Sequence, residues 1–156
     1  MPIYYKLTEY TDIYTRMLRN MTIRKCNICT NTMIISEIAI KILRYEFNIY
    51  KKELGLKSIE FKVFRETGIY KETTSLVANY IRKIAKLSKI CDLNRKDNDL
   101  LYELADDFAA ANYDFNDIVF AKICKEYNLT FVTHDKDFKN YGIKVMTANK
   151  NLLKSN

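Results

Sequence analysis

Acidic side chains gather in two short motifs in the last third of the chain. The first motif is Asp114-Phe115-Asn116-Asp117, and the second is Thr133-His134-Asp135-Lys136-Asp137-Phe138. An apolar helix and a short strand are expected between them, which places acids at a helix start and just past a strand end. Strand ends of a parallel α/β sheet meet along one edge, so these acids can converge there. Clustered carboxylates repel one another and a divalent cation removes that repulsion, so the pattern predicts a metal site.

Two further acids stand at comparable places. Glu9 follows a first expected strand at residues 3–7, and Glu37 lies on an apolar helix that opens at Thr32 and runs to Phe47. An acid among isoleucines is costly to bury unless it has a partner. For Glu37 that partner is either a lysine or arginine, or a metal ion.

Each of these acids also has a purely structural explanation. Asp114 and Asp117 suit the positive end of a helix dipole. Asp135 suits a turn that follows a strand, and Glu9 suits an exposed strand end. No single acid therefore identifies a site, and only the combination carries weight.

The elements that must position these acids are short strands separated by helices. Further strands are expected at residues 27–30, 129–133 and 143–146, and a helix cap is expected at Thr73 or Thr74. Residues 50–70 favour helix or irregular structure. The alternation predicts an α/β layer arrangement with a mostly parallel sheet, in one domain of residues 1–156. The other expected helices start at Thr11 or Asp12, carry the apolar residues between Leu100 and Ala109, and span residues 115–126.

The charge balance by itself fits a polyanion partner or a solvated, lysine-rich surface equally well. Lysine and arginine number 26 against 19 aspartates and glutamates, a net charge of +7 and a pI of about 9.1. A basic surface is the electrostatic footprint of a nucleic-acid-binding protein. An overall basic chain with a local acidic cluster has what a metal-dependent enzyme acting on a phosphate backbone needs.

The remaining composition indicates a cytoplasmic protein. Apolar residues make up 48% of the chain, enough for a real core, yet no apolar run approaches a membrane span and the first ten residues lack a signal-peptide core. The four cysteines are Cys26, Cys29, Cys91 and Cys124. One Cys-x-x-Cys pair without a second, and a single histidine, favour buried reduced thiols over a zinc site. His134 is expected to be a loop residue rather than a ligand.

The motifs together resemble a PIN-domain ribonuclease, the family of the VapC toxins and of many archaeal homologues. The resemblance rests on a strand followed by an acid and on three segments, Ile35-Ser36-Glu37-Ile38, Asn116-Asp117-Ile118-Val119-Phe120-Ala121 and residues 131–138. It extends from about residue 3 to about residue 150. It implies a three-layer α/β fold in which a mostly parallel central sheet of about four to five short strands is flanked by helices.

The resemblance also implies a set of site residues. Glu9, Glu37, Asp117 and Asp135 would be catalytic and would ligate Mg²⁺ or Mn²⁺, which activates water in phosphodiester hydrolysis. The family has aspartate at the first position, where this chain offers Glu9 or, one helical turn later, Asp12. Residues that would support the ligands or hold metal-bound waters are Asp12, Asp114, Asn116, Thr133 and Asp137.

The function implied is that of a metal-dependent endoribonuclease, with a toxin of a toxin–antitoxin pair as one role. RNA, an antitoxin protein and a second copy of the chain are the partners that the resemblance implies. A DNA-directed nuclease is one alternative, because the same acids cleave either backbone. A catalytically weak or inactive PIN-like module that binds nucleic acid or protein is the other, and Glu9 in place of aspartate motivates it.

Overall fold

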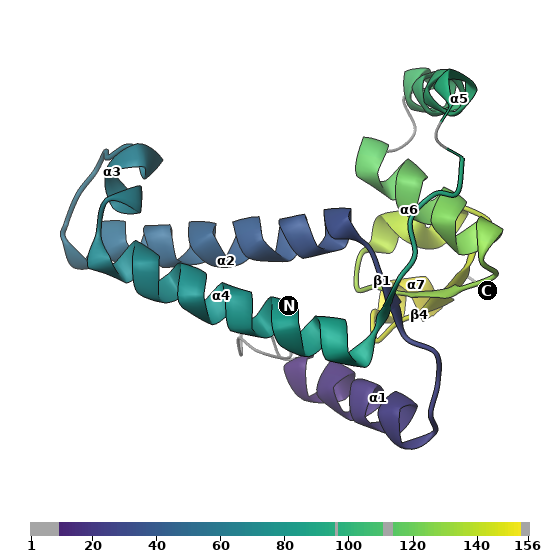
Figure 1. Ribbon diagram of the computed structural model, residues 1–156, viewed down its shortest axis with the longest axis horizontal. Coiled ribbons are helices and arrows are strands. Elements are labelled where there is room, and N and C mark those ends of the chain that lie inside the picture. Colours follow the sequence, from purple (N-terminus) through teal and green to yellow (C-terminus); the bar gives the residue numbers. More distant parts are fainter. Residues whose placement is uncertain (1–9, 96, 111–113, 154–156) are drawn as a thin grey trace. The chain divides into compact units, whose positions relative to one another are not determined.

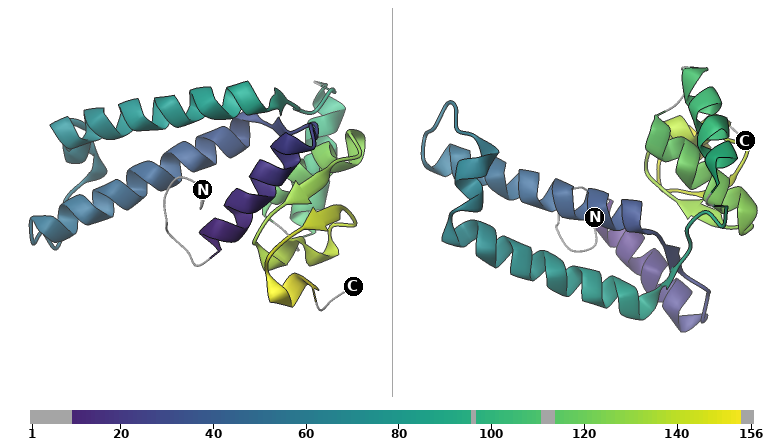
Figure 2. Two further views of the ribbon diagram at one scale, coloured as in Figure 1. Left: turned by 90° about the horizontal axis from the view of Figure 1, so that it is seen from below. Right: turned by 45° about the horizontal axis from the view of Figure 1, so that its top comes forward.

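The computed structural model describes residues 10–95, 97–110 and 114–153 (Figures 1 and 2). The chain forms two compact units. One is continuous, Lys25–Ile90, and is called the hairpin unit below. The other combines Met1–Arg24 with Cys91–Asn156 and is called the discontinuous unit.

The hairpin unit consists of two long helices between two short parallel strands. Strand β1 (Cys29–Thr30) leads into α2 (Thr32–Glu53), and α4 (Gly68–Leu87) returns to β2 (Lys89–Ile90), which pairs with β1. Helices α2 and α4 lie side by side in every view (Figures 1 and 2). The buried Asn31 begins α2, since its side chain accepts a hydrogen bond from the Ile34 N–H at 2.8 Å.

An aromatic cluster closes the turn of this hairpin. The short helix α3 (Phe61–Arg65) places Phe64 at its centre with no exposed surface. Its ring centroid lies between 5.4 and 5.7 Å from the rings of four neighbours drawn from α2, α3 and α4. These neighbours are Phe47, Tyr50, Phe61 and Tyr70. Residues 50–70, whose pattern favoured helix or irregular structure, therefore contain a short helix anchored by one buried ring.

The start of α4 corrects one expectation. The capping residue is Thr67, whose hydroxyl accepts a hydrogen bond from Tyr70 N–H at 3.2 Å, and not Thr73 or Thr74. Thr73 lies inside the helix, buried, and donates its hydroxyl to the Ile69 carbonyl. A threonine that bonds backward within a helix and one that caps it look alike in the sequence.

The discontinuous unit is built around α6 (Phe115–Glu126), its most buried helix. Helix α1 (Thr11–Ile23) comes from the N-terminal part, and α5 (Asn98–Ala109) precedes α6. After α6 come β3 (Thr130–Val132), the 3₁₀ helix η1 (Lys136–Asn140), β4 (Lys144–Met146) and α7 (Lys150–Leu153). Strands β3 and β4 are parallel, with Phe131 opposite Val145. The core of this unit centres on α6, whose buried residues are Ile118, Val119, Phe120, Ala121, Ile123 and Cys124.

The end of α6 is determined by local sequence. Asn128 has φ of 50°, and its N–H donates to the Lys125 carbonyl while the Leu129 N–H donates to the Cys124 carbonyl at 2.8 Å. These two bonds form the motif that closes a helix with a left-handed residue, a role asparagine tolerates. The predicted helix span, residues 115–126, is confirmed.

The α/β class with parallel strands is confirmed, while its finer description stays a prediction. Among the described residues the strands form two parallel pairs, β1 with β2 and β3 with β4. The expected first strand, residues 3–7, lies outside the described residues. Strand β2 and helix α7 were not expected. The three layers and the central sheet of four to five strands stay predictions.

The cysteines correct a second expectation in part. All four lie among the described residues and none forms a disulfide. Cys91 and Cys124 are buried as expected, but Cys26 is exposed and Cys29 is half-buried. Over the described ranges, no helix combines the length and the apolar character that crossing a membrane requires.

Candidate functional site

The first acidic motif forms the start of α6. Asp114 is the exposed residue that precedes the helix, and its backbone carbonyl accepts the Ile118 N–H at 3.1 Å. Asn116 and Asp117 are half-buried in the first turn. The apolar residues from Ile118 onward are buried in the core. The polar first turn of α6 therefore lies at the edge of that core. A carboxylate here is stabilised by the helix dipole.

The second acidic motif follows β3 and is locally ordered. The Asp135 N–H donates to the Thr133 hydroxyl at 3.0 Å, and the Asp137 N–H donates to the Asp135 carboxylate at 3.1 Å. Asp135 is exposed and begins η1. The buried Phe138 packs on Phe131 of β3, with 4.6 Å between the ring centroids, and anchors this loop. Asp135 is therefore a turn residue, as expected, and its side chain is exposed at the surface.

Helix α1 packs directly against the end of β3. The ring of Tyr10 lies 4.2 Å from the His134 ring, centroid to centroid. The buried Tyr14 hydroxyl donates to the Thr133 carbonyl at 3.0 Å, accepts the Ala148 N–H at 3.1 Å, and lies 3.1 Å from His134 Nδ1. A hydroxyl has one proton, so with Thr133 as its acceptor the contact to His134 requires an N–H at Nδ1. The start of α1 is thus held beside the strand end that leads to Asp135.

This packing separates the two candidates for the first acid. Asp12 is exposed and lies two residues from both Tyr10 and Tyr14. Two residues rotate a helix by about 200°, which puts Asp12 on the side of α1 opposite the face that carries Tyr14. Glu9, the neighbour of Tyr10 in the sequence, lies outside the described residues.

Glu37 is found on α2 of the hairpin unit, whereas Asp117 and Asp135 belong to the discontinuous unit. Its side chain is 35% exposed, and one oxygen lies 3.7 Å from the Lys41 ammonium, one helical turn away. A basic partner was one of the two alternatives for this acid, and Lys41 supplies it. An ion pair of this exposure is weak and does not by itself explain the placement of Glu37.

The donor chemistry suits a hard cation, but the described residues do not complete a site. Carboxylate oxygens such as those of Asp117 and Asp135 are the ligands that Mg²⁺ and Mn²⁺ prefer. Within the described ranges no three His, Cys, Asp or Glu side chains come together as metal ligands would.

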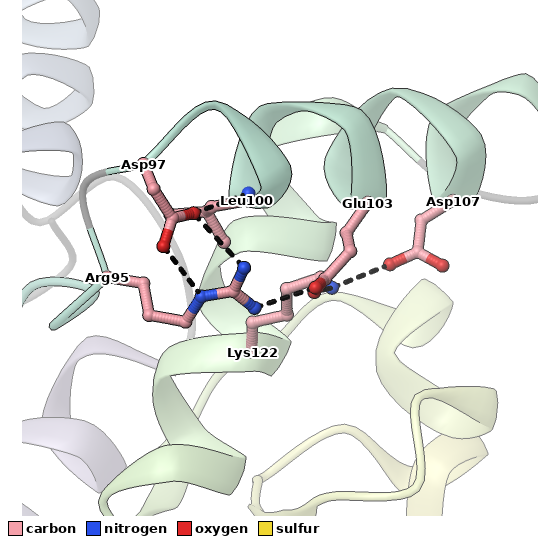
Figure 3. Close-up of polar contacts among 6 residues, drawn as sticks. All are labelled: Arg95, Asp97, Leu100, Glu103, Asp107 and Lys122. Atoms are coloured by element: carbon pink, nitrogen blue, oxygen red, sulfur yellow. Dashed lines mark hydrogen bonds and ion pairs between the residues drawn. The ribbon is translucent and has the colours of Figure 1, made fainter.

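A charged network that the sequence did not predict joins α5 to α6 (Figure 3). The Arg95 guanidinium bonds the carboxylates of Asp97 at 3.1 Å and Glu103 at 2.6 Å. The Lys122 ammonium of α6 lies 3.3 Å from Glu103 and 3.1 Å from Asp107. Asp97 also begins α5 by accepting the Leu100 N–H at 2.9 Å. The only local sequence signal for this network was Asp97, an aspartate three residues before the apolar Leu100, which is the spacing of a helix cap.

The network shifts the pKa of Asp97, Glu103 and Lys122 in the direction that favours the charged form of each group. Hydrogen bonds from Arg95 hold the pKa of Asp97 below its usual value, and those from Arg95 and then Lys122 do the same for Glu103. Partial burial alone would lower the pKa of Lys122, but its bonds to Asp107 and Glu103 outweigh that effect and raise it. Asp97, Glu103 and Lys122 therefore stay charged near neutral pH, and the ion pairs of Lys122 with Glu103 and Asp107 connect α5 to the helix that carries Asp117.

These observations define an α/β protein with parallel strands and with acids at a helix start and at a strand end. The family model described as PIN domain matches residues 9–144. The chain belongs to the PIN-domain family, whose members are generally nucleases. No curated protein and no solved structure matches the chain significantly.

Proposed function

We propose that this protein is a divalent-metal-dependent endoribonuclease. The observation that carries the proposal is the packing of Tyr10 and Tyr14 against Thr133 and His134. It holds the N-terminal end of α1 beside the strand end that leads to Asp135. Asp135 follows that strand end, and the family to which the chain belongs consists generally of nucleases, which supports the proposal.

The proposed metal ligands are Glu9, Glu37, Asp117 and Asp135, holding Mg²⁺ or Mn²⁺. The bound ion would supply Lewis-acid chemistry to the phosphodiester and to the attacking water. The chain's own residues keep the carboxylates in place, since Thr133 accepts the Asp135 N–H and Asp135 accepts the Asp137 N–H. Asp114 and Asn116 stand beside Asp117 at the start of α6 and are proposed to support it. Glu9 is preferred to Asp12 because Asp12 is on the helix face opposite Tyr14.

The proposal includes the finer fold and the biological setting. The family match covers residues 9–144 and so includes residues of both compact units, which supports one PIN-like domain over residues 1–156. Its central parallel sheet would have about four to five strands in three layers. A cytoplasmic toxin with an antitoxin partner, acting as a homodimer, is the role proposed for it.

The test is cleavage of matched RNA and DNA substrates. Single-stranded and structured RNA, and DNA of the same sequence, are incubated with the protein in Mn²⁺, Mg²⁺ or EDTA. Cleavage of RNA in either metal and none in EDTA is expected. Cleavage in EDTA would refute the metal dependence, and cleavage of DNA alone would transfer the activity to the DNA-directed alternative.

A binding module without cleavage is the second candidate. It is favoured by Lys41, which pairs with Glu37, and by glutamate in place of the family aspartate at position 9. If the protein binds RNA in EDTA and never cleaves it in any metal, this second function replaces the first.

A further inference from the structure

The positive charge of the chain belongs to only one of the two compact units. The hairpin unit, Lys25–Ile90, contains 13 lysines and arginines and 6 glutamates, an excess of seven. The discontinuous unit contains the other 13 basic residues and 13 acidic residues, and is neutral. The whole net charge of +7 is therefore carried by the hairpin unit.

Within this unit, basic and polar side chains line one exposed face of α4. The residues Lys71, Ser75, Asn79, Arg82 and Lys86 follow one another at intervals of three or four, and Lys83 flanks them; we call this set the α4 stripe. All six are exposed. Residues spaced in this way lie above one another on a helix. From Lys71 to Lys86 the stripe extends for about 22 Å along the axis.

The stripe is on the solvent side of the helix. The buried residues of α4 are Thr73 and Val77, which lie on the face opposite Arg82, and α4 packs beside α2. The Arg82 guanidinium donates to the Asn79 side-chain oxygen at 2.8 Å, so part of the stripe is held in one arrangement. Glu72, near the N-terminal end, is the one acidic residue of α4. The stripe thus offers a row of cations that no ion pair within it neutralises.

We propose that the α4 stripe binds the phosphate backbone of the RNA substrate. This inference rests on the proposed function and names the surface that holds its substrate. Two of the proposed ligands, Asp117 and Asp135, belong to a unit that has no excess positive charge. The excess of cations that attracts a polyanion lies in the hairpin unit, where the stripe supplies cations together with the hydrogen-bonding groups of Ser75 and Asn79. Phosphate contacts of this kind hold a strand without reading its sequence.

The test compares two triple variants of equal net charge. Arg82→Gln, Lys83→Gln and Lys86→Gln together remove three charges from the stripe. Arg19→Gln, Lys125→Gln and Lys150→Gln remove three exposed charges from the discontinuous unit. Binding of a fluorescein-labelled single-stranded RNA is followed by fluorescence anisotropy in EDTA, over a range of salt concentrations. Glutamine is a good helix former, so α4 should be kept. Circular dichroism checks that the variant is folded. If the triple variant is unfolded, the Lys83→Gln/Lys86→Gln double variant replaces it.

The stripe variant is expected to bind RNA at least tenfold more weakly near 0.1 M salt. The slope of log affinity against log salt should fall by about 2, since each lost phosphate contact contributes roughly 0.7 for a single strand. The matched control should change affinity less than threefold. Equal losses of affinity in both variants would show that only net charge matters. Unchanged RNA binding in the stripe variant would favour an acidic protein surface as the partner of the stripe. Either result overturns the proposal. A protein that binds through the stripe yet cleaves nothing in Mn²⁺ or Mg²⁺ would refute only the nuclease activity.

Discussion

Asp117 lies in the first turn of α6, directly before the buried core residues of that helix. Replacing it with asparagine removes a charge and almost no volume. We expect Asp117→Asn to lower the rate of RNA cleavage in Mn²⁺ at least 100-fold, because a metal site loses one charged ligand. The loss of helix-dipole stabilisation should cost only about 0.3–1 kcal/mol. Single-turnover cleavage and thermal unfolding measure the two effects.

Asp99→Asn is the matched control for this change. Asp99 stands in the first turn of α5, one position nearer the helix start than Asp117 is in α6, so the same substitution is made in a comparable helix-dipole environment. Its stability should change by a similar amount and its cleavage rate should not change. A cleavage rate of Asp117→Asn equal to that of the unsubstituted chain would remove Asp117 from the site.

The first acid is decided by a pair of variants at residues 9 and 12. We expect Glu9→Gln to abolish cleavage and Asp12→Asn to leave it unchanged, because Asp12 is exposed on the face of α1 opposite Tyr14. Glutamate is one methylene longer than the family aspartate, so slow cleavage with a preference for Mn²⁺ is expected in the unsubstituted chain. Loss in Asp12→Asn alone would transfer the role to Asp12, and loss in neither would favour the binding module.

Tyr14 connects three segments through one hydroxyl. Tyr14→Phe keeps the ring but leaves the Thr133 carbonyl and the Ala148 N–H without their partner. A fully buried group left without its hydrogen bond costs about 1–3 kcal/mol, and both of these bonds are only part-buried, so the free energy of unfolding should fall by about 1–3 kcal/mol in total. Urea denaturation measures it. Tyr127→Phe, which removes an exposed hydroxyl bonded to Asp92 and Asn94, should cost less than Tyr14→Phe; the reverse order would contradict the role given to Tyr14.

At the scale of elements, the hairpin turn depends on one ring. Phe64 has no exposed surface and contacts aromatic rings from α2, α3 and α4. We expect Phe64→Ala to lower the free energy of unfolding by about 3–5 kcal/mol, the cost of deleting a buried phenyl group. The adjacent Val63→Ala, at a side chain 47% exposed, should cost well under half as much. Chemical denaturation compares the two, and equal losses would show that the aromatic cluster is not the anchor.

For the whole molecule, the net charge of +7 predicts a steep dependence of RNA binding on salt. Three or four phosphate contacts release counterions, so affinity should fall by roughly tenfold or more between 50 mM and 200 mM salt. Anisotropy titrations of the unsubstituted chain in EDTA measure this. An affinity that stays flat over the same range would favour a protein partner over a nucleic acid.

Local sequence was sufficient for the helix and the strand that lead to the acids. The bounds of α6, the stop at Asn128 and the strand before Thr133 follow from apolar spacing and turn residues within a few positions. Local sequence was less reliable for choosing the residue that caps α4. Thr67 and Thr73 both have backbone groups within hydrogen-bonding reach of their hydroxyls, so the sequence does not distinguish the cap from the internal threonine. The two-residue strand β2 was missed, since so short a strand has no periodicity to detect.

The sequence by itself determined the family, the α/β class and the types of residue available for chemistry, because helix spacing, caps and motifs are written in neighbouring positions. The tertiary structure alone decided how distant segments meet. The Tyr14 hydroxyl reaches a carbonyl 119 positions away in the chain, and Arg95, Glu103 and Lys122 join elements that no periodicity connects. It also showed that the basic residues follow one unit and one face of α4. Such contacts depend on how the whole chain packs, and the same local sequence pattern is compatible with many different arrangements of its helices and strands.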